Sequence, residues 1–298
     1  MPLHRRLNDA VHFKTERGNY IMLRSMYSGI SGLKNFQTKL DVIGNNIANV
    51  NTYGFKKGRV VFKDLYSQQV SLAGAPGTAR GGVNPKQVGL GSQLGAIDTI
   101  HAPGSAQFTG NTLDLAIEGD GLFIVGDPDG GERFYTRAGN FYLDAGAGDT
   151  DESANLVDGE GRFVLNSSGE KIIIPLSATS LSVSQDGIVS YVSKDDDGNN
   201  VLDTAGTIGI AKFNNPGGLE KVGGNLYKES ANSGAPSVDV PLSEGGHGAV
   251  KSGSLEMSNV DLSEEFTEMI VAQRGFQANT RIITTSDEIL QELVNLKR

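Results

Sequence analysis

Residues 23–50, LRSMYSGISGLKNFQTKLDVIGNNIANV, carry apolar side chains at alternating spacings of three and four. This spacing places them along one stripe of an α-helix, as in a coiled coil. The asparagines that end the stretch, and Gly54 beyond them, favour the turn and left-handed conformations that stop a helix. We therefore predict a long helix that ends near residue 50. Its apolar seam includes Leu33, Leu40, Ile43 and Ile47.

The C-terminal end of the chain has the same pattern. From residue 262 to residue 294, the seam positions alternate at spacings of four and three, with polar residues at some of them. We predict a second long helix that pairs with the first. Opposite net charges, +6 for residues 22–63 and −4 for residues 255–298, favour this pairing. The second seam includes Leu262, Phe266, Met269, Phe276, Ile283 and Leu290.

The two stripes are too wide for one helix pair to bury, and polar residues interrupt both. An ordinary core-facing helix gives a similar stripe, but here the stripes lie at opposite ends of the chain and the middle shows little helical periodicity. We therefore expect other copies of the chain to cover what remains. A contact between identical subunits that does not close on itself produces a helical filament.

The middle of the chain has the pattern of a β domain. Residues 64–254 carry a net charge of −13, and their short apolar runs are separated by Gly, Asp and Asn turn signals. We predict an α+β fold with paired terminal helices and a mainly antiparallel β domain. The expected parts are a discontinuous helical domain (22–63 and 255–298), an extended connector (64–100) and a β-rich outer domain (101–254).

Residues 1–21 fit none of these patterns. They have no clean apolar periodicity and lack the apolar core of a signal peptide. Codons for Glu16-Arg17-Gly18 could form a purine-rich ribosome-binding site a few codons before Met22. We expect translation to start at Met22, so that residues 1–21 are a non-native or disordered extension. The alternative is a genuine flexible tail.

Composition excludes several classes of protein. The chain of 298 residues has no Cys, which rules out a disulfide-stapled scaffold, a Cys-ligated metal and thiol chemistry. A net charge of −9 argues against nucleic acid or an anionic membrane as the main partner. No run of eighteen apolar residues occurs, so we expect no membrane insertion.

No motif points to catalysis. The four His residues are far apart, and neither a GxSxG elbow nor a phosphate-binding glycine loop is present. The acidic run from Asp195 to Asn200 lacks the Gly and Glu that a calcium loop starting at Asp195 would need, so we interpret it as a solvated turn. We predict no catalytic residue, no metal site and no cofactor, and hence a protein that is not an enzyme.

Four ordered motifs resemble one family. Residues 40–56, LDVIGNNIANVNTYGFK, resemble the N-terminal signature of bacterial flagellar axial proteins, the rod and hook subunits, and SNVDL (258–262) with MIVAQR (269–274) resembles its C-terminal partner. TGNTLDLAIEGDG (109–121) with YTRAGNF (135–141), and GGNLY (223–227), are similar to internal motifs of that family. The signature residues are Asn45, Asn46, Asn49, Thr52, Gly54, Phe55, Gln273 and Arg274.

This resemblance implies a subunit that is exported unfolded through the flagellar type III pathway without a cleaved signal peptide. It then polymerises into a helical tube, with its terminal helices forming the inner tube and its β domain outside. The implied partners are other copies of the chain, rod and hook–filament junction proteins, and, transiently, the hook cap and the export apparatus. The implied location is the bacterial flagellum, in the extracellular hook or the basal body.

Residues 40–56 and the ending LVNL (293–296) look more like a hook protein than a distal rod protein. We therefore expect a short hook subunit, similar to the short hook proteins of Gram-positive bacilli, which joins the rod to the filament and transmits torque. The distal rod subunit is the alternative, because about 190 residues between the helical ends leave room for one β domain and little more. An alternative from another class is an exported β-rich adhesin or carbohydrate-binding module whose helices merely oligomerise it.

Overall fold

A computed structural model describes residues 3–77, 81–128, 131–145, 153–194 and 199–296; of residues 3–23 it describes the backbone only. The chain divides into two compact units. Unit 1 comprises residues 1–47, 58–98 and 262–298, and unit 2 comprises residues 48–57 and 99–261. The domain boundaries expected from the sequence stay predictions.

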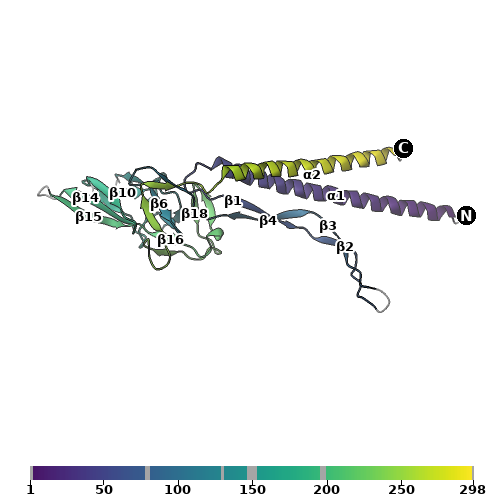
Figure 1. Ribbon diagram of the computed structural model, residues 1–298, viewed down its shortest axis with the longest axis horizontal. Coiled ribbons are helices and arrows are strands. Elements are labelled where there is room, and N and C mark those ends of the chain that lie inside the picture. The colour runs from purple at the N-terminus through teal and green to yellow at the C-terminus, as the bar shows by residue number, and fades with distance from the viewer. Residues whose placement is uncertain (1–2, 78–80, 129–130, 146–152, 195–198, 297–298) are drawn as a thin grey trace. The chain divides into compact units, whose positions relative to one another are not determined.

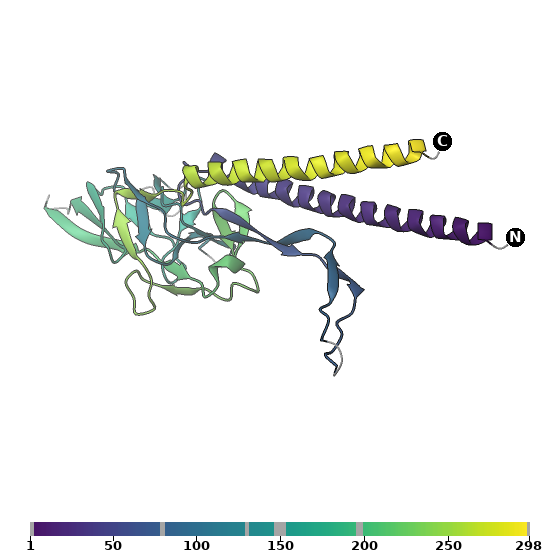
Figure 2. The ribbon, with the colours of Figure 1, turned by 45° about the vertical axis from the view of Figure 1, so that its right-hand side comes forward.

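Two long helices dominate unit 1 within the described residues, and they lie side by side in both views of the ribbon (Figures 1 and 2). Helix α1 spans Leu3–Ala48 and helix α2 spans Leu262–Leu296. Glu264 and Glu265 lie in the first turn of α2, where carboxylates interact favourably with the helix dipole. The prediction that residues 1–21 are a non-native or disordered extension stays a prediction.

Most strands of unit 1 lie in the segment expected to be a connector (64–100), but the first of them covers residues 58–64, nearly all of which were expected to belong to the helical domain. Strand β1 (Gly58–Asp64) pairs with β4 (Ser92–Thr99), and β2 (Ser67–Ser71) pairs antiparallel with β3 (Lys86–Gly89). The pair β2–β3 is mostly exposed. Among the described residues, neither helix contains a stretch long and apolar enough to cross a membrane.

Unit 2 is built around an antiparallel sheet in which, among the described residues, ten strands take part. The main path runs in the order β12 (Ile173–Pro175), β10 (Ser153–Val157), β11 (Phe163–Val164), β7 (Leu122–Gly126), β8 (Arg133–Thr136), β18 (Leu226–Lys228) and β17 (Glu220–Gly223). Off this path, β9 (Tyr142–Asp144) pairs with β10, and β16 (Ile210–Lys212) pairs with β7 and with β19 (Ser237–Asp239).

Smaller antiparallel sheets complete unit 2. Strands β13 (Ser180–Val183), β14 (Ile188–Lys194) and β15 (Asn200–Thr207) form one of them. The pairs β6 (Leu115–Glu118) with β20 (Ala249–Ser252), and β5 (Ala106–Phe108) with β21 (Ser254–Glu256), form the others, and a short 3₁₀ helix covers Pro216–Gly218. The acidic run at 195–198 lies outside the described residues.

The core of unit 2 explains why nearly every residue of β7 is apolar. Phe123 and Val125 face one buried cluster, where Phe123 meets Phe141 edge to face at 5.1 Å between ring centroids. Leu122 and Ile124 face a second cluster on the other side of the strand. Successive strand residues point to opposite faces, so a strand with both faces covered must be apolar throughout. The predicted α+β fold is confirmed.

Candidate functional site

Small residues line the facing sides of α1 and α2 and allow a close approach. A Cβ on Gly275 would lie 2.6 Å from the ring of Phe36, and one on Gly32 would lie 3.0 Å from the side-chain nitrogen of Asn279. Each glycine is therefore the hole that receives a side chain from the other helix. Gly32 precedes Phe36 on α1, whereas its partner Asn279 follows Gly275 on α2. The two helices therefore run antiparallel.

Asn46 connects three segments of unit 1 near the end of α1. Its Oδ1 accepts a hydrogen bond from the backbone N–H of Gly58 at 3.0 Å, and its Nδ2 donates to the carbonyl oxygen of the same residue at 2.9 Å. Nδ2 also donates to Oε2 of Glu265 on α2 at 3.1 Å. Both side chains of this pair are buried, at 1% exposed for Asn46 and 5% for Glu265. A partly exposed ion pair between Lys39 and Glu268 also joins the two helices.

The predicted seam residues differ in how far the structure covers them. Leu262 and Phe266, at the start of α2, are 39% and 50% exposed. Ile43 is buried, and the half-buried members are Leu33, Leu40, Ile47, Met269, Phe276, Ile283 and Leu290. Their role in contacts between subunits stays a prediction.

Helix α2 also carries an apolar stripe that the sequence reading missed. Ile282 and Ile289 are 44% and 49% exposed, and Val271 and Leu296 are exposed as well. These residues are spaced by eleven or seven positions, which brings them to one side of a helix. An exposed apolar stripe on a helix is typical of a surface that another chain covers.

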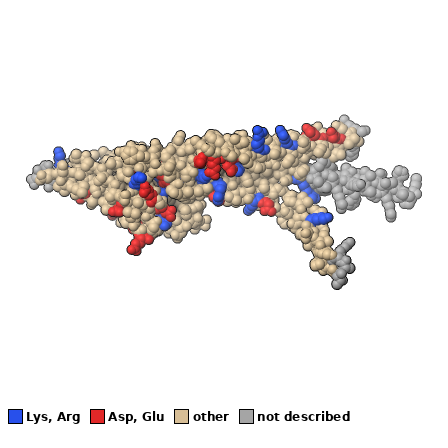
Figure 3. Space-filling view, in the orientation of Figure 1, with Lys and Arg blue, Asp and Glu red and all other residues tan. Residues whose placement is uncertain are grey.

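The charges of α2 are segregated along its length. Basic side chains lie midway along the face of the helix seen in Figure 3, and acidic side chains lie toward its C-terminal end. Arg274 and Arg281 are the basic residues of this helix, and Asp287, Glu288 and Glu292 are the acidic residues of its last three turns. Such segregation lets a second helix with a complementary pattern be oriented by charge.

The signature residues around the end of α1 have structural roles that can be stated. Asn46, Gly54 and Phe55 are buried, whereas Asn49 and Thr52 are half-buried and hydrogen-bonded to each other at 3.1 Å. Gly54 has a φ of +68°, and a Cβ there would lie 2.6 Å from the backbone nitrogen of Ala138. The glycine is therefore required by conformation and by space. The remaining signature residues, Asn45, Gln273 and Arg274, are exposed.

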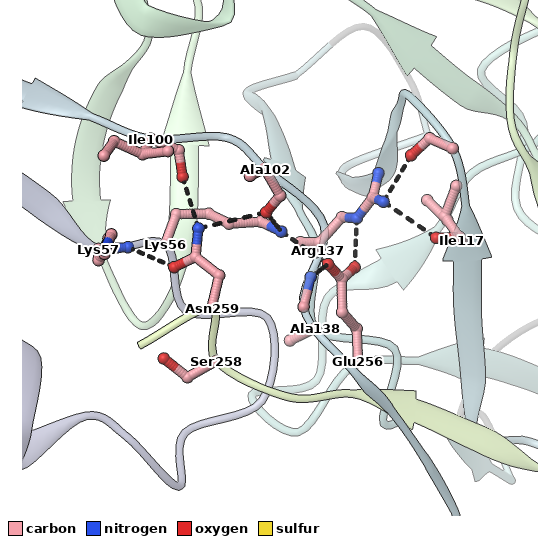
Figure 4. Close-up of polar contacts among 12 residues, drawn as sticks. Lys56, Lys57, Ile100, Ala102, Ile117, Arg137, Ala138, Glu256, Ser258 and Asn259 are labelled. Carbon is pink, nitrogen blue, oxygen red and sulfur yellow. Dashed lines mark hydrogen bonds and ion pairs between the residues drawn. The ribbon is translucent and has the colours of Figure 1, made fainter. Parts of the chain in front are cut away.

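A buried charge cluster holds together the first and last segments of unit 2 (Figure 4). Nζ of Lys56 lies 2.6 Å from Oε1 of Glu256 and donates to the carbonyl oxygen of Ala102 at 2.9 Å. Arg137 pairs with the other carboxylate oxygen of Glu256 through Nε, and its guanidinium also donates to the carbonyl of Ile117 at 2.9 Å. The backbone N–H of Gly104 donates to Oε1 at 2.8 Å. This network compensates each of the buried charges.

The electrostatics of the cluster follow from its composition. Burial opposes the ionisation of Glu256, but Arg137, Lys56 and the N–H of Gly104 outweigh it and lower the pKa of this carboxyl. Burial, and then the nearby charge of Glu256, raise the pKa of Tyr227 to about 12. Around neutral pH the carboxyl of Glu256 is therefore ionised and the hydroxyl of Tyr227 is neutral.

Asn259, just before α2 begins, also connects segments of unit 2 that are far apart in sequence (Figure 4). Its Oδ1 accepts a hydrogen bond from the backbone N–H of Lys57 at 2.8 Å, and its Nδ2 donates to the carbonyl oxygen of Ile100 at 2.8 Å. The backbone N–H of Ile100 in turn donates to the carbonyl oxygen of Lys57 at 2.9 Å. Three segments far apart in sequence are thus bonded by one side chain.

His101 lies at a cavity of about 290 Å³ in unit 2, together with Lys56, Arg137 and Lys212. Burial, and then the charges of Lys56, Lys221 and Arg137, lower its pKa to about 4. The ring packs against Tyr227 at 5.5 Å between centroids. His101 is therefore a neutral packed side chain. Among the side chains that the structure describes, no group of three acidic or His residues could hold a metal ion.

Three family descriptions match separate parts of the chain. Residues 26–56 match "Flagella basal body rod protein", residues 116–191 match "Flagellar hook protein FlgE/F/G D1 domain", and residues 251–296 match "Flagellar basal body rod FlgEFG protein C-terminal". The matches follow the order of the motifs identified in the sequence. The first contains most of α1's described side chains, and the last contains all of α2.

Individual relatives match almost the whole chain. The flagellar basal-body rod protein FlgG of Bacillus subtilis is 60% identical over 277 residues, which cover 93% of this chain and 100% of the relative. The FlgG protein of Borreliella burgdorferi is 41% identical over 281 residues, with the same coverage. The flagellar hook protein FlgE of the same organism is 33% identical over 444 aligned positions, again with 93% of this chain and 100% of the relative covered.

The expectation of a hook subunit is wrong. Of the two Borreliella burgdorferi relatives, the rod protein has the higher sequence identity to this chain, 41% against 33% for the hook protein. The alignment with the hook protein is much longer because that protein contains a long stretch with no counterpart in this chain. The motifs that favoured the hook, at 40–56 and 293–296, lie in the terminal regions that rod and hook proteins share. The finding that overturns the hook expectation is the 60% identity to a rod protein over that relative's whole length, and the small number of residues between the helices agrees with it.

Proposed function

Because the chain belongs to the flagellar basal-body rod and hook protein family, we propose that it is a structural subunit of the distal rod of the bacterial flagellar basal body. The single observation that carries this proposal is the 60% identity to a rod protein over the relative's entire length. The family is one of structural proteins, and the chain is not an enzyme.

The rod subunit assembles with copies of itself through its terminal helices. The exposed apolar stripe of α2 supports this step, because Ile282 and Ile289 would otherwise remain in contact with water. The covered face of each helix is already occupied within the chain, so the exposed stripe is the surface left for a second copy. Other axial proteins of the flagellum are the expected neighbours at the two ends of the rod.

Labelling of isolated hook–basal bodies tests the proposed location. An antibody raised against unit 2 is expected to bind the rod segment below the hook, and hook–basal bodies from cells lacking the gene should be absent or should end before the distal rod. Labelling confined to the hook would contradict the proposal. A strain that lacks the chain and still swims would contradict any axial role and would return attention to an exported adhesin.

A further inference from the structure

The apolar seam alone does not determine how far α1 and α2 are displaced along each other. On each helix the half-buried apolar residues recur every seven positions. A slide of seven residues, about 10 Å at 1.5 Å per residue, would therefore place one apolar set where the next had been. Several alignments would bury similar apolar surface. The recurring residues are Leu33, Leu40 and Ile47 on α1, and Met269, Phe276, Ile283 and Leu290 on α2.

The observed contacts nevertheless belong to one alignment. Phe36 faces Gly275, and Asn279 faces Gly32. Moving four residues along α1, from Phe36 to Gly32, corresponds to moving four residues along α2, from Gly275 to Asn279. Asn46 lies ten residues from Phe36 in the other direction, and its partner Glu265 lies ten residues from Gly275. One antiparallel register thus accounts for all three pairs.

The hydrogen-bonded pair of Asn46 and Glu265 makes the displaced alignments unfavourable, whereas the apolar residues do not. After a slide of seven residues, Asn46 would face either Ala272 or Ser258, and Ser258 precedes α2. Glu265 would then lose the hydrogen bond from Nδ2 of Asn46, although it is nearly fully buried in the native register. A buried carboxylate without a partner is strongly disfavoured. Both bonds to Gly58 hold the amide of Asn46 in place, so it cannot follow Glu265 along the helix.

We propose that Asn46 and Glu265 are the register-determining residues of the helix pair. A buried polar pair in a helical seam costs stability relative to an apolar pair, but it excludes other alignments. The alignment determines which outward-facing residues of α1 and α2 lie at the same position along the helix axis. It therefore defines the surface that a second copy contacts. This consequence for assembly rests on the proposed function, whereas the register itself does not.

Pulsed electron spin resonance can measure the register directly. The chain has no Cys, so nitroxides attached through Gln37→Cys and Glu292→Cys report one intramolecular distance when labelled full-length chain is diluted into unlabelled chain. Both positions are exposed. In the native register they are separated by about 27 Å along the helix axis, and a slide of seven residues changes this by about 10 Å.

The chain with native Asn46 and Glu265 is expected to give a single distance. Glu265→Leu should add a second population displaced by about 10 Å. Asn46→Leu combined with Glu265→Leu, which leaves neither partner buried and unpaired, should fold and show both populations. Glu265→Gln keeps an acceptor for Asn46 and should retain the single distance. Glu288→Leu makes the same substitution as Glu265→Leu at an exposed position of α2 and should also retain it.

An unchanged single distance in both Leu variants would overturn the proposal, and so would several distances in the chain that retains the native pair. Sedimentation of the same samples scores polymerisation separately. A chain that never sediments but shows the expected pattern of distances would contradict the rod function while supporting the register pair.

Discussion

Lys56 and Glu256 form a buried ion pair, with 2.6 Å between Nζ and Oε1 and with side chains only 2% and 3% exposed. They are separated by 200 residues in sequence. Glu256 also pairs with Arg137, so one carboxylate compensates two buried cations and joins the start of unit 2 to its end.

Replacement of Glu256 by Gln is expected to destabilise unit 2 by about 3–5 kcal/mol, because both cations lose their buried counterion. Urea unfolding followed by near-ultraviolet circular dichroism measures this change. Glu118→Gln is the matched control, since Glu118 pairs with Lys251 at 3.0 Å on the surface and its loss should cost about 1 kcal/mol or less. Equal effects of the two substitutions would contradict the importance of the buried cluster.

The pH dependence of unit 2 should reveal the same carboxyl. The pKa of Glu256 is lower in the folded chain than in the unfolded chain, where the carboxyl has the ordinary pKa of a glutamate. Its ionised form therefore stabilises the fold fully above that value, and the stabilisation disappears as the pH falls through the lowered native pKa. Unfolding free energies measured from neutral to acidic pH should decline less steeply in Glu256→Gln. Identical slopes in both proteins would be inconsistent with this origin.

The contact of Phe36 with Gly275 predicts an unusual effect of alanine. Gly→Ala inside a helix normally stabilises it by about 1 kcal/mol. Gly275→Ala should instead destabilise the helix pair, because the new Cβ would lie 2.6 Å from the ring of Phe36. In a Phe36→Ala background the same substitution should become stabilising. Gly44→Ala, whose Cβ would meet nothing within 4 Å, should be stabilising in either background; thermal unfolding of the helical signal checks all of these variants.

A charge placed in the predicted seam should block assembly. Ile47→Asp and Phe276→Asp each put a carboxylate at a half-buried apolar position, which is costly unless the helices separate. We expect loss of sedimentable polymer, with the near-ultraviolet signal of unit 2 unchanged. Gln277→Asp adds the same charge at the exposed neighbouring position and should assemble. Normal filaments from either seam variant would refute the seam assignment.

The exposed stripe of α2 should behave differently. Ile282→Asp replaces an apolar side chain that is already 44% exposed, so the unassembled chain should keep its helix content and lose less stability than the seam variants do. Polymer formation should nevertheless be lost, because the carboxylate would be buried between copies. Thr284→Asp provides the exposed polar control on the same helix. If Ile282→Asp assembles as well as Thr284→Asp does, the stripe is not an interface.

The terminal helices and the β-rich middle could be predicted because both depend on local periodicity. Leu40 and Phe276 each belong to a series of apolar residues at helical spacing. The run from Leu122 to Val125 is apolar because both faces of its strand are covered. The stripe through Ile282 was present in the sequence as spacings of seven and eleven. It was missed because a single alternation of three and four was followed along the helix.

The buried cluster and the register pair could not be predicted in the same way. No local pattern connects Lys56 to Glu256, and a lone Asn46 at the end of a helix is equally consistent with capping. Their pairing depends on how the folded chain brings distant segments together. The choice of hook over rod failed for another reason, since the terminal signatures are shared and the relevant information lay in the length between them.

A reconstruction of the isolated basal body by electron cryomicroscopy tests the central claim most directly. The account predicts that this chain fits the density of the distal rod, with Ile282 and Ile289 of α2 buried against neighbouring copies. Density for the chain in the hook only, or in the rod with this stripe facing solvent, would contradict it.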